Sequence, residues 1–514
     1  VQAVRQKSPE PNAILRKYCS LFEPRDREAF GQFVLESWLH EDTRLIDPDE
    51  AHRQAVAEAQ QIHRATSQYY ALTQRAGKTV EEITESILPR WLSTVAGSAI
   101  GSKGLLAVAA ACTAERAAPA VSRYLKAYYG TRAAQGKALI GMLAWVDHPS
   151  ATQLMLSVGS RFRTKSFQEE AIRQAEALAE RNNWTLAELS DRTVDSAGFD
   201  EDGEMELDYG ARKFTARLMA DLTVALFNED GKKIANLPEP RQSDDPELAK
   251  AAKKTLPAVR KQIKSTVEQQ TDRLYEALCT EREWSFEDWD VYLNRHPVVR
   301  RLVQRLVWVE MDGDQAGRAF RPMDDGSLTD ASDEEVELAP EARVRLAHDW
   351  LLDDAEVGRW QQHLADYEVK PLFQQLGKGR YRLPAGKADE VKISDFEGHL
   401  IESFTLRGRA TRLGYTRGAP GDGGWFHTYV KRFPTLGLEA MIEFTGSPLP
   451  EESRTVALIS LSFADDRGGE HWQRPALPLS KIPKILLSEC YTDLKLIAGE
   501  GKGFDPDWRK KTEY

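Results

Sequence analysis

The hydrophobic period of this chain first changes near Asp195, and that change constrains the fold more than any other feature of the sequence. From about Ala13 to Asn183, apolar residues recur at three- and four-residue spacing, which predicts helices. After Asp195, short alternating or β-branched segments lie between Asp-Gly turns, which predicts strands. Because these strands are dispersed among helices without a regular βαβ alternation, we expect an α+β fold.

The amino-terminal helices are short and follow one another closely. Between Ala133 and Arg181 the pattern predicts three consecutive helices, and short antiparallel helices stacked in sequence are typical of HEAT-type α-solenoids. Three predicted helix starts carry a capping box, in which a hydroxyl and a carboxylate three residues later satisfy free amides: Thr79 with Glu82, Ser166 with Glu169, and Thr185 with Glu188. We therefore expect a HEAT-like all-α array.

Four regions follow from these patterns. They are a helical HEAT-like array (1–190), a small β-meander (191–240), a helical connector (241–296) and a mixed α+β carboxy-terminal domain (297–514). In the connector, Asp245 and Pro246 predict a helix start, and Pro257 is expected to break or kink that helix. In the last region, 400–407 is predicted to be a strand and 483–498 a helix.

Charge and cysteine content exclude several classes of protein. Lys and Arg number 69 against 80 Asp and Glu, a net charge of −11, so the molecule as a whole is not attracted to nucleic acid or anionic lipid. The four cysteines form no CxxC pair, which favours a reducing compartment and a cytoplasmic location. The longest apolar stretch is interrupted by Lys103, so no membrane span is expected. The chain opens without Met or a signal peptide, which suggests the carboxy-terminal part of a longer protein.

Recognisable catalytic signatures are missing from the sequence. It contains no GxxxxGK[ST], GxGxxG, GxSxG or HExxH string, and its ten histidines form no pair at metal-ligand spacing. We therefore predict no metal and no cofactor. Whether the chain is an enzyme stays open, and the missing signatures favour a protein without catalytic activity. One weak catalytic candidate is His348, which follows a predicted strand beside Asp349 and could act as a general base; the alternative is a structural histidine.

An arginine-rich segment is the main candidate for ligand binding. Guanidinium groups bind phosphate or carboxylate bidentately, and the surrounding glycines permit close backbone approach. The residues that could form such an anion cradle on a wide hairpin are Arg407, Arg409, Arg412, Arg417 and Trp425. The alternative is that these arginines pair with nearby acidic residues of the same fold.

A second cationic cluster lies in the helical connector. An apolar stripe on this predicted helix is opposed by a face that carries Lys250, Lys253, Lys254, Lys261 and Lys264. Such lysines commonly form a solvated helix face; the alternative is a surface that binds phosphate or an acidic partner.

Several short strings resemble one bacterial family. They include Glu188-Leu-Ser-Asp-Arg192, Leu207-Asp-Tyr-Gly210, Asn228-Glu-Asp-Gly-Lys232, His296-Pro297, Arg305-Leu-Val-Trp308, Leu346-Ala-His348, Pro371-Leu-Phe-Gln-Gln375 and Leu487-Ser-Glu489. From about residue 130 to the end, the chain is similar to the MolR-like proteins that carry domain of unknown function 4132, named for a link to molybdate-metabolism regulation. The family has no accepted catalytic residues to transfer.

The resemblance implies a context rather than a reaction. Family members often carry a WGR domain, but no Trp-Gly-Arg string occurs here, so the associated link to DNA damage is unsupported. Relatives are encoded beside MoxR-type AAA+ ATPases and von Willebrand A domain proteins, which implies that such a protein is the partner.

Three hypotheses for the function follow. The leading one is a non-enzymatic interaction scaffold or adaptor of a bacterial stress, regulatory or conflict system, working with an AAA+ ATPase. The alternative is a domain or enzyme that binds a phosphate or nucleotide ligand through the arginine-rich segment. The third is association with nucleic acid, which the net charge of −11 disfavours.

Overall fold

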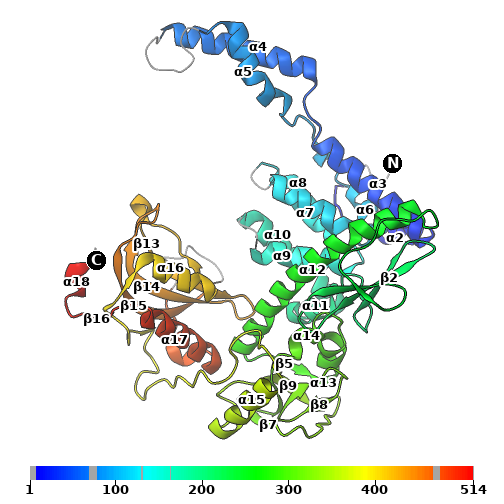
Figure 1. Ribbon diagram of the computed structural model, residues 1–514. Coiled ribbons are helices and arrows are strands. Elements are labelled where there is room, and N and C mark those ends of the chain that lie inside the picture. The colour runs from blue at the N-terminus through cyan, green and yellow to red at the C-terminus, as the bar shows by residue number, and fades with distance from the viewer. Residues whose placement is uncertain (1–6, 69–77, 129–130, 162–163, 467–474, 513–514) are drawn as a thin grey trace. The chain divides into compact units, whose positions relative to one another are not determined.

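The computed structural model describes residues 7–68, 78–128, 131–161, 164–466 and 475–512 (Figure 1). The chain divides into two compact units, unit 1 (Val1–Asp195) and unit 2 (Ser196–Tyr514). Among the described residues, unit 1 contains helices with one isolated β-bridge, and unit 2 combines three sheets with helices, so the α+β prediction is confirmed. The finer division at residues 240 and 296 stays a prediction.

Unit 1 is a succession of short helices. They are α2 (Ala13–Cys19), α3 (Pro24–Asp42), α4 (Pro48–Gln68), α5 (Val80–Leu92), α6 (Leu105–Cys112), α7 (Ala117–Tyr128), α8 (Ala133–Leu143), α9 (Pro149–Arg161), α10 (Lys165–Asn182) and α11 (Leu186–Arg192). The three helices predicted between 133 and 181 are α8, α9 and α10. Capping boxes begin α5 at Thr79 and α11 at Thr185, as predicted.

The third predicted capping box is wrong. Helix α10 begins at Lys165 after Thr164, whose side chain makes no capping hydrogen bond, and Ser166 lies inside the first turn. Phe167 and Ala171 of α10 are buried in the core, so packing stabilises this helix although its start has no side-chain cap.

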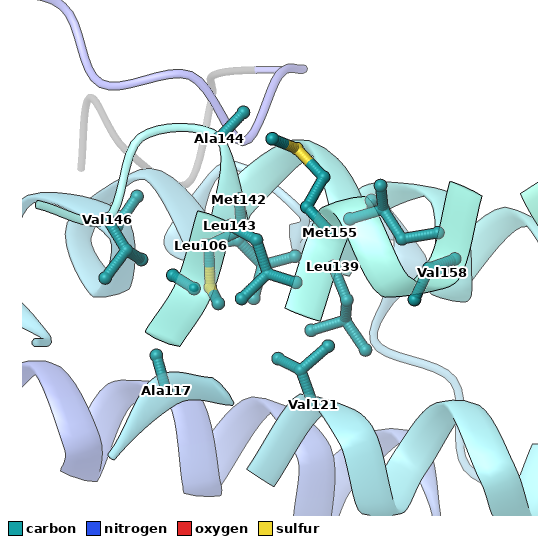
Figure 2. Packing of buried hydrophobic residues seen from close by; sticks show 14 of the residues in the cluster. Leu106, Ala117, Val121, Leu139, Met142, Leu143, Ala144, Val146, Met155 and Val158 are labelled. Atoms are coloured by element: carbon teal, nitrogen blue, oxygen red, sulfur yellow. The ribbon is translucent and has the colours of Figure 1, made fainter. Parts of the chain in front are cut away.

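One hydrophobic core joins most of unit 1. Figure 2 shows Val121 of α7 facing Leu139 of α8, with Met155 and Val158 of α9 beside them. All four side chains are buried. Since the hydrophobic effect scales with the apolar area removed from water, this shared core is the main source of stability for unit 1.

Helices α4 and α5 form an arm with a small core of its own, in which Ala55 and Ala59 pack against Ile83 and Ile87. The chain enters and leaves this arm through two paired backbone segments, which we call the neck. The Ile46 amide donates to the Thr94 carbonyl at 2.9 Å, and the Ala96 amide donates to the Arg44 carbonyl at 3.0 Å. The two ends of the arm are thus held together by backbone hydrogen bonds.

A buried carboxylate fixes the base of the neck. Asp42, fully buried at the end of α3, accepts hydrogen bonds from the Ala99 amide (2.8 Å) and from Arg132 Nη1 (2.9 Å). The hydroxyl of Tyr124 donates to the same carboxylate. Because a buried charge is costly unless it is paired and hydrogen-bonded, this arrangement holds both sides of the neck against α7 and α8.

The first part of unit 2 is a four-stranded antiparallel meander, β1 (Glu204–Asp208), β2 (Lys213–Leu218), β3 (Val224–Phe227) and β4 (Lys233–Ile234). The long helix α12 (Pro246–Cys279) packs on it through Ala252, Leu256 and Val259. Asp245 caps this helix, as predicted, by accepting from the amides of residues 247 and 248. The helix continues through Pro257, so the predicted break does not occur.

The middle of unit 2 contains a five-stranded sheet with the order β5-β9-β6-β7-β8. Its strands are β5 (Glu283–Ser285), β6 (Trp308–Asp312), β7 (Gln315–Pro322), β8 (Leu328–Thr329) and β9 (Arg343–Leu346), and the helices α13 (Phe286–Trp289), α14 (Arg300–Val303) and α15 (Asp354–Asp366) accompany it. Trp308 lies at the centre of an aromatic group, in edge contact with Trp284 and Trp289.

The last part of unit 2 is a larger sheet, with the order β12-β13-β14-β15-β11-β16 and β10 paired to β15. Its elements are β10 (Lys392–Ile393), β11 (His399–Glu402), α16 (Ser403–Arg412), β12 (Thr416–Arg417), β13 (Phe426–Phe433), β14 (Leu438–Ser447), β15 (Thr455–Asp465), α17 (Lys484–Gly499), β16 (Gly503–Phe504) and α18 (Trp508–Lys511). Helices α16 and α17 pack against the sheet in one hydrophobic core (Figure 1).

The predicted strand at 400–407 is wrong beyond Glu402. Helix α16 starts at Ser403, and its apolar residues Leu406 and Ala410 are buried one turn apart. The carboxylate of Glu402 makes no capping hydrogen bond, so the usual sequence signal of a helix start is missing.

Among the described residues, no helix is long and apolar enough to cross a membrane.

Candidate functional site

His348, the weak catalytic candidate, is fully buried in unit 2. The backbone amide of Trp350 donates to its Nδ1 at 3.1 Å, so the ring carries its proton on Nε2 and donates to Glu489 Oε1 at 3.4 Å. Both ring nitrogens are therefore used in the fold, one by the turn after β9 and one by α17.

Glu489 joins His348 to a larger cluster, the buried ionic network, which consists of Tyr275, His348, Lys378, Lys431, Glu489 and Asp493. Glu489 Oε2 accepts from Lys378 Nζ at 2.6 Å and from the Tyr275 hydroxyl at 3.0 Å. Lys431 Nζ donates to the Tyr275 oxygen at 3.0 Å and to Asp493 Oδ2 at 2.9 Å. One chain of hydrogen bonds thus connects five parts of unit 2: α12, the turn after β9, the segment after α15, β13 and α17.

The electrostatics of the network differ between its two acidic side chains, Glu489 and Asp493. Burial alone would raise the pKa of Glu489, but the hydrogen bond from His348 and the charge of Lys378 outweigh it and hold the pKa at about 2. Burial alone would lower the pKa of Lys431, but the Asp493 carboxylate raises it above its ordinary value. Burial raises the pKa of Asp493, although Lys431 opposes that shift. Two basic side chains therefore lie beside two acidic side chains, Lys378 beside Glu489 and Lys431 beside Asp493.

The nucleophiles around the network are held in their protonated form. Burial raises the pKa of the Cys490 thiol to about 12, and it raises the pKa values of Cys279 and Tyr275 well above their ordinary range. A thiol with such a pKa is a poor nucleophile because only the thiolate attacks. Among the described residues, no group of His, Cys, Asp and Glu is arranged to hold a metal ion. The network is built to connect elements of the fold.

Sequence reasoning identified only His348 in this network, although two signals were present. Glu489 and Asp493 lie one turn apart on the otherwise apolar face of α17, where buried acids need partners. Lys431 lies two residues from each of the buried residues Tyr429 and Phe433 along β13, so it shares their inner face of the strand.

The arginine-rich segment does not form the predicted hairpin, because Arg407, Arg409 and Arg412 lie on α16. Arg407 and Arg417 nevertheless meet at one carboxylate, where Glu451 accepts from them at 3.0 and 2.9 Å. Arg409 faces Glu500 at 3.8 Å, and Arg412 is exposed without an ion pair to any described residue.

Trp425 belongs to a neighbouring contact. The guanidinium of Arg454 lies 5.1 Å from the centre of its ring. These contacts match the alternative in which the arginines pair with acidic residues, and anion binding stays a prediction.

The predicted lysine face lies on α12, opposite the residues that pack on the meander. Lys253 is set apart from the others, since it is half-buried and pairs with Glu239 at 2.7 Å. The remaining four, Lys250, Lys254, Lys261 and Lys264, are exposed.

A further surface, absent from the sequence predictions, lies on α2 and α3. The name apolar patch is used here for six exposed side chains: Ile14 and Tyr18 of α2, Leu21 and Phe22 of the turn between the two helices, and Phe30 and Phe33 of α3. Tyr18 and Phe33 are each 66% exposed and Leu21 is 70% exposed, and the rings of Phe22 and Phe30 stack at 5.9 Å. The apolar spacing that predicted these helices did not reveal the patch. The buried side of α3 is formed by other side chains, including Leu35 and Trp38.

Part of unit 2 is similar to a known protein family. Residues 231–415 match the family model described as a domain of unknown function, DUF4132. The match includes Tyr275, His348 and Lys378, whereas Lys431, Glu489 and Asp493 lie beyond it.

One curated relative is the uncharacterized protein YehI of Escherichia coli strain K12, which is 26% identical over 337 residues. The aligned region covers 63% of this chain and 28% of the length of that relative. No solved structure matches.

Proposed function

We propose that this chain is a non-enzymatic protein-interaction scaffold or adaptor of a bacterial stress, regulatory or conflict system, acting in the cytoplasm. The apolar patch on α2 and α3 is the observation that carries this proposal. Soluble proteins rarely expose several large apolar side chains together unless a partner covers them, and aromatic residues are enriched at the centres of protein interfaces.

The patch is presented on a rigid support. Gly31 of α3 lies so close to α6 that a side-chain carbon at this position would come within 2.6 Å of the Thr113 amide nitrogen. The opposite side of α3 is anchored by the buried residues Leu35 and Trp38. A preorganised surface loses little conformational entropy on binding, which favours its use as a docking site.

Two other features support a binding role over catalysis. The HEAT-like interpretation of unit 1 is consistent with partner binding, because solenoids bind along extended helical surfaces. In unit 2, the buried thiols have raised pKa values and both nitrogens of His348 are engaged. The MolR-like resemblance suggests a MoxR-type AAA+ ATPase or a von Willebrand A domain protein as the partner.

The test compares capture of partners from native lysate by the parent chain and by a Tyr18→Ser, Phe33→Ser variant. We expect a specific protein to be retained by the parent chain and lost from the variant, since interface aromatics commonly contribute about 2 kcal/mol or more each. Circular dichroism should be the same for both, because neither side chain is buried.

Phe504→Ser is the matched control, since Phe504 is 63% exposed but lies in unit 2. Retention of the same protein by this control supports the proposal. Equal retention by the patch variant, or the absence of any specific partner, would contradict it. The phosphate- or nucleotide-binding alternative and the nucleic-acid alternative stay predictions.

A further inference from the structure

Helix α12 carries a row of four lysines that the proposed function does not use. The row consists of Lys250, Lys254, Lys261 and Lys264, and we call it the lysine row. Their spacing of four, seven and three residues returns to the same side of an α-helix, so the row extends over about 21 Å of its length.

The stretch of α12 that carries the lysine row contains no acidic residue. Between Glu247 and Glu268, α12 has six basic residues and no Asp or Glu, although acids outnumber bases in the whole chain by 80 to 69. Two of the six cations are used within the fold: Lys253 pairs with Glu239, and Arg260 Nη2 donates to the Val224 carbonyl at 3.2 Å. None of the four lysines in the row has an ion pair or hydrogen bond to a residue that the structure describes.

The like charges of the lysine row destabilise α12 when no partner is bound. Like charges three or four residues apart on a helix destabilise it, and both the 250/254 pair and the 261/264 pair have this spacing. Helix α12 cannot rotate to relieve the repulsion, because Leu256, Val259 and Ile263 on its opposite side are buried against the meander. An acidic partner placed along the row would remove the repulsion.

We propose that the lysine row docks an acidic helix of a protein partner, one that carries Asp or Glu at three- and four-residue spacing along one face. The residues between the lysines, Pro257 and Ala258, are small and exposed, so a second helix can approach closely. Paired rows of opposite charge along two helices set partner choice and orientation.

The composition of the row favours a protein over a nucleic acid. Nucleic-acid surfaces combine lysines with arginine forks that read bases and with aromatic rings that stack on them, and the row has neither. The row belongs to unit 2, so this inference is independent of the apolar patch.

The test measures binding of the full chain to three fluorescent probes at low salt. The first is a helical peptide of 21 residues with glutamates along one face at four- and three-residue spacing. The second has the same composition with the glutamates distributed around the helix, and the third is duplex DNA. We expect the first peptide to bind most tightly and to weaken as salt is added.

Two variants with equal charge change distinguish the row from net charge. The row variant replaces the four lysines of the row by glutamate, and the control variant replaces Lys232, Lys233, Lys370 and Lys495, which are also exposed. We expect the row variant to bind the first peptide about tenfold more weakly or worse, and the control variant to keep most of the affinity.

A version with glutamine in place of the four lysines guards against misfolding, and it should lose affinity by a smaller factor. Equal binding of the two peptides, or equal loss in both glutamate variants, would overturn the proposal. Tighter binding of DNA would also overturn it and would assign the row to nucleic acid. Because the row and the patch are altered separately, failure here leaves the result of the Tyr18→Ser, Phe33→Ser experiment unaffected.

Discussion

At the scale of single residues, the most informative side chain is Glu489. Its two carboxylate oxygens receive three hydrogen bonds, from His348, Lys378 and Tyr275, and the side chain is 1% exposed. A carboxylate in that position holds together elements that are far apart in sequence. Removing one partner of a buried ion pair is costly because the remaining charge stays desolvated.

We expect Glu489→Gln to lower the free energy of unfolding by roughly 3–5 kcal/mol, because Lys378 loses its carboxylate partner in a buried site. Urea titration of the parent chain and the variant measures this difference. Glu500→Gln, at the exposed end of α17, is the control and should change stability by less than about 1 kcal/mol. Equal effects of the two substitutions would show that the network contributes little.

The same residue predicts a pH dependence. The pKa of Glu489 is about 2 in the folded chain and 4.5 without perturbation, so the unfolded state binds the proton more readily. Its contribution to stability is complete above about pH 4.5 and is lost as the pH falls toward 2. The stability difference between the parent chain and Glu489→Gln should therefore shrink over that range.

Single residues also show which parts of the buried ionic network could be predicted from the sequence. It placed His348 at a strand end beside an acid, but the carboxylate that contacts it is Glu489, which is 141 positions away. Spacing cannot reveal pairs of that kind, because they form only when separate elements pack. The inward direction of Lys431 was readable from strand alternation, whereas its partners were not.

At the scale of elements, hydrophobic periodicity predicted the positions of helices and strands correctly where the local pattern agrees with the packing. The meander, the start of α12 and helix α17 lie within a few residues of their predicted positions. The prediction of a strand at 400–407 failed because the four-residue strand β11 runs directly into α16 without a side-chain cap. The four arginines were consequently assigned to a hairpin, although three of them lie on a helix.

The arm formed by α4 and α5 supports a prediction about excision. The neck brings Arg44 and Ala96 into hydrogen-bond contact, so joining them by a short glycine linker removes 45–95 without moving either end. We expect the shortened chain to keep the shared core of unit 1 and to lose only the helical signal of the arm. Circular dichroism and urea unfolding measure this; loss of cooperative unfolding would contradict it.

At the scale of the whole molecule, each compact unit has hydrophobic cores of its own. The core around Leu139 lies within unit 1, and the cores around Leu256, Val309 and Ile442 lie within unit 2. We expect residues 196–514 to fold alone, because the buried ionic network and all three sheets lie inside that range.

Expression of 196–514 and urea unfolding test this expectation. A single cooperative transition, with a midpoint matching one transition of the full chain, is the expected result. An insoluble or gradually unfolding product would show that unit 2 depends on unit 1. The fold class, its helical beginning and the change near Asp195 were predictable from periodicity, whereas the contacts that make each side of that boundary compact are not encoded in sequence spacing.

The four cysteines of the chain have a practical consequence. Cys19 and Cys112 are buried in unit 1, and Cys279 and Cys490 are buried in unit 2, all as free thiols. Alkylating reagents reach such thiols only when the surrounding structure opens. Each unit therefore contains two natural reporters of its own opening, and mass spectrometry of the labelled peptides can time the exposure of each unit without any added tag.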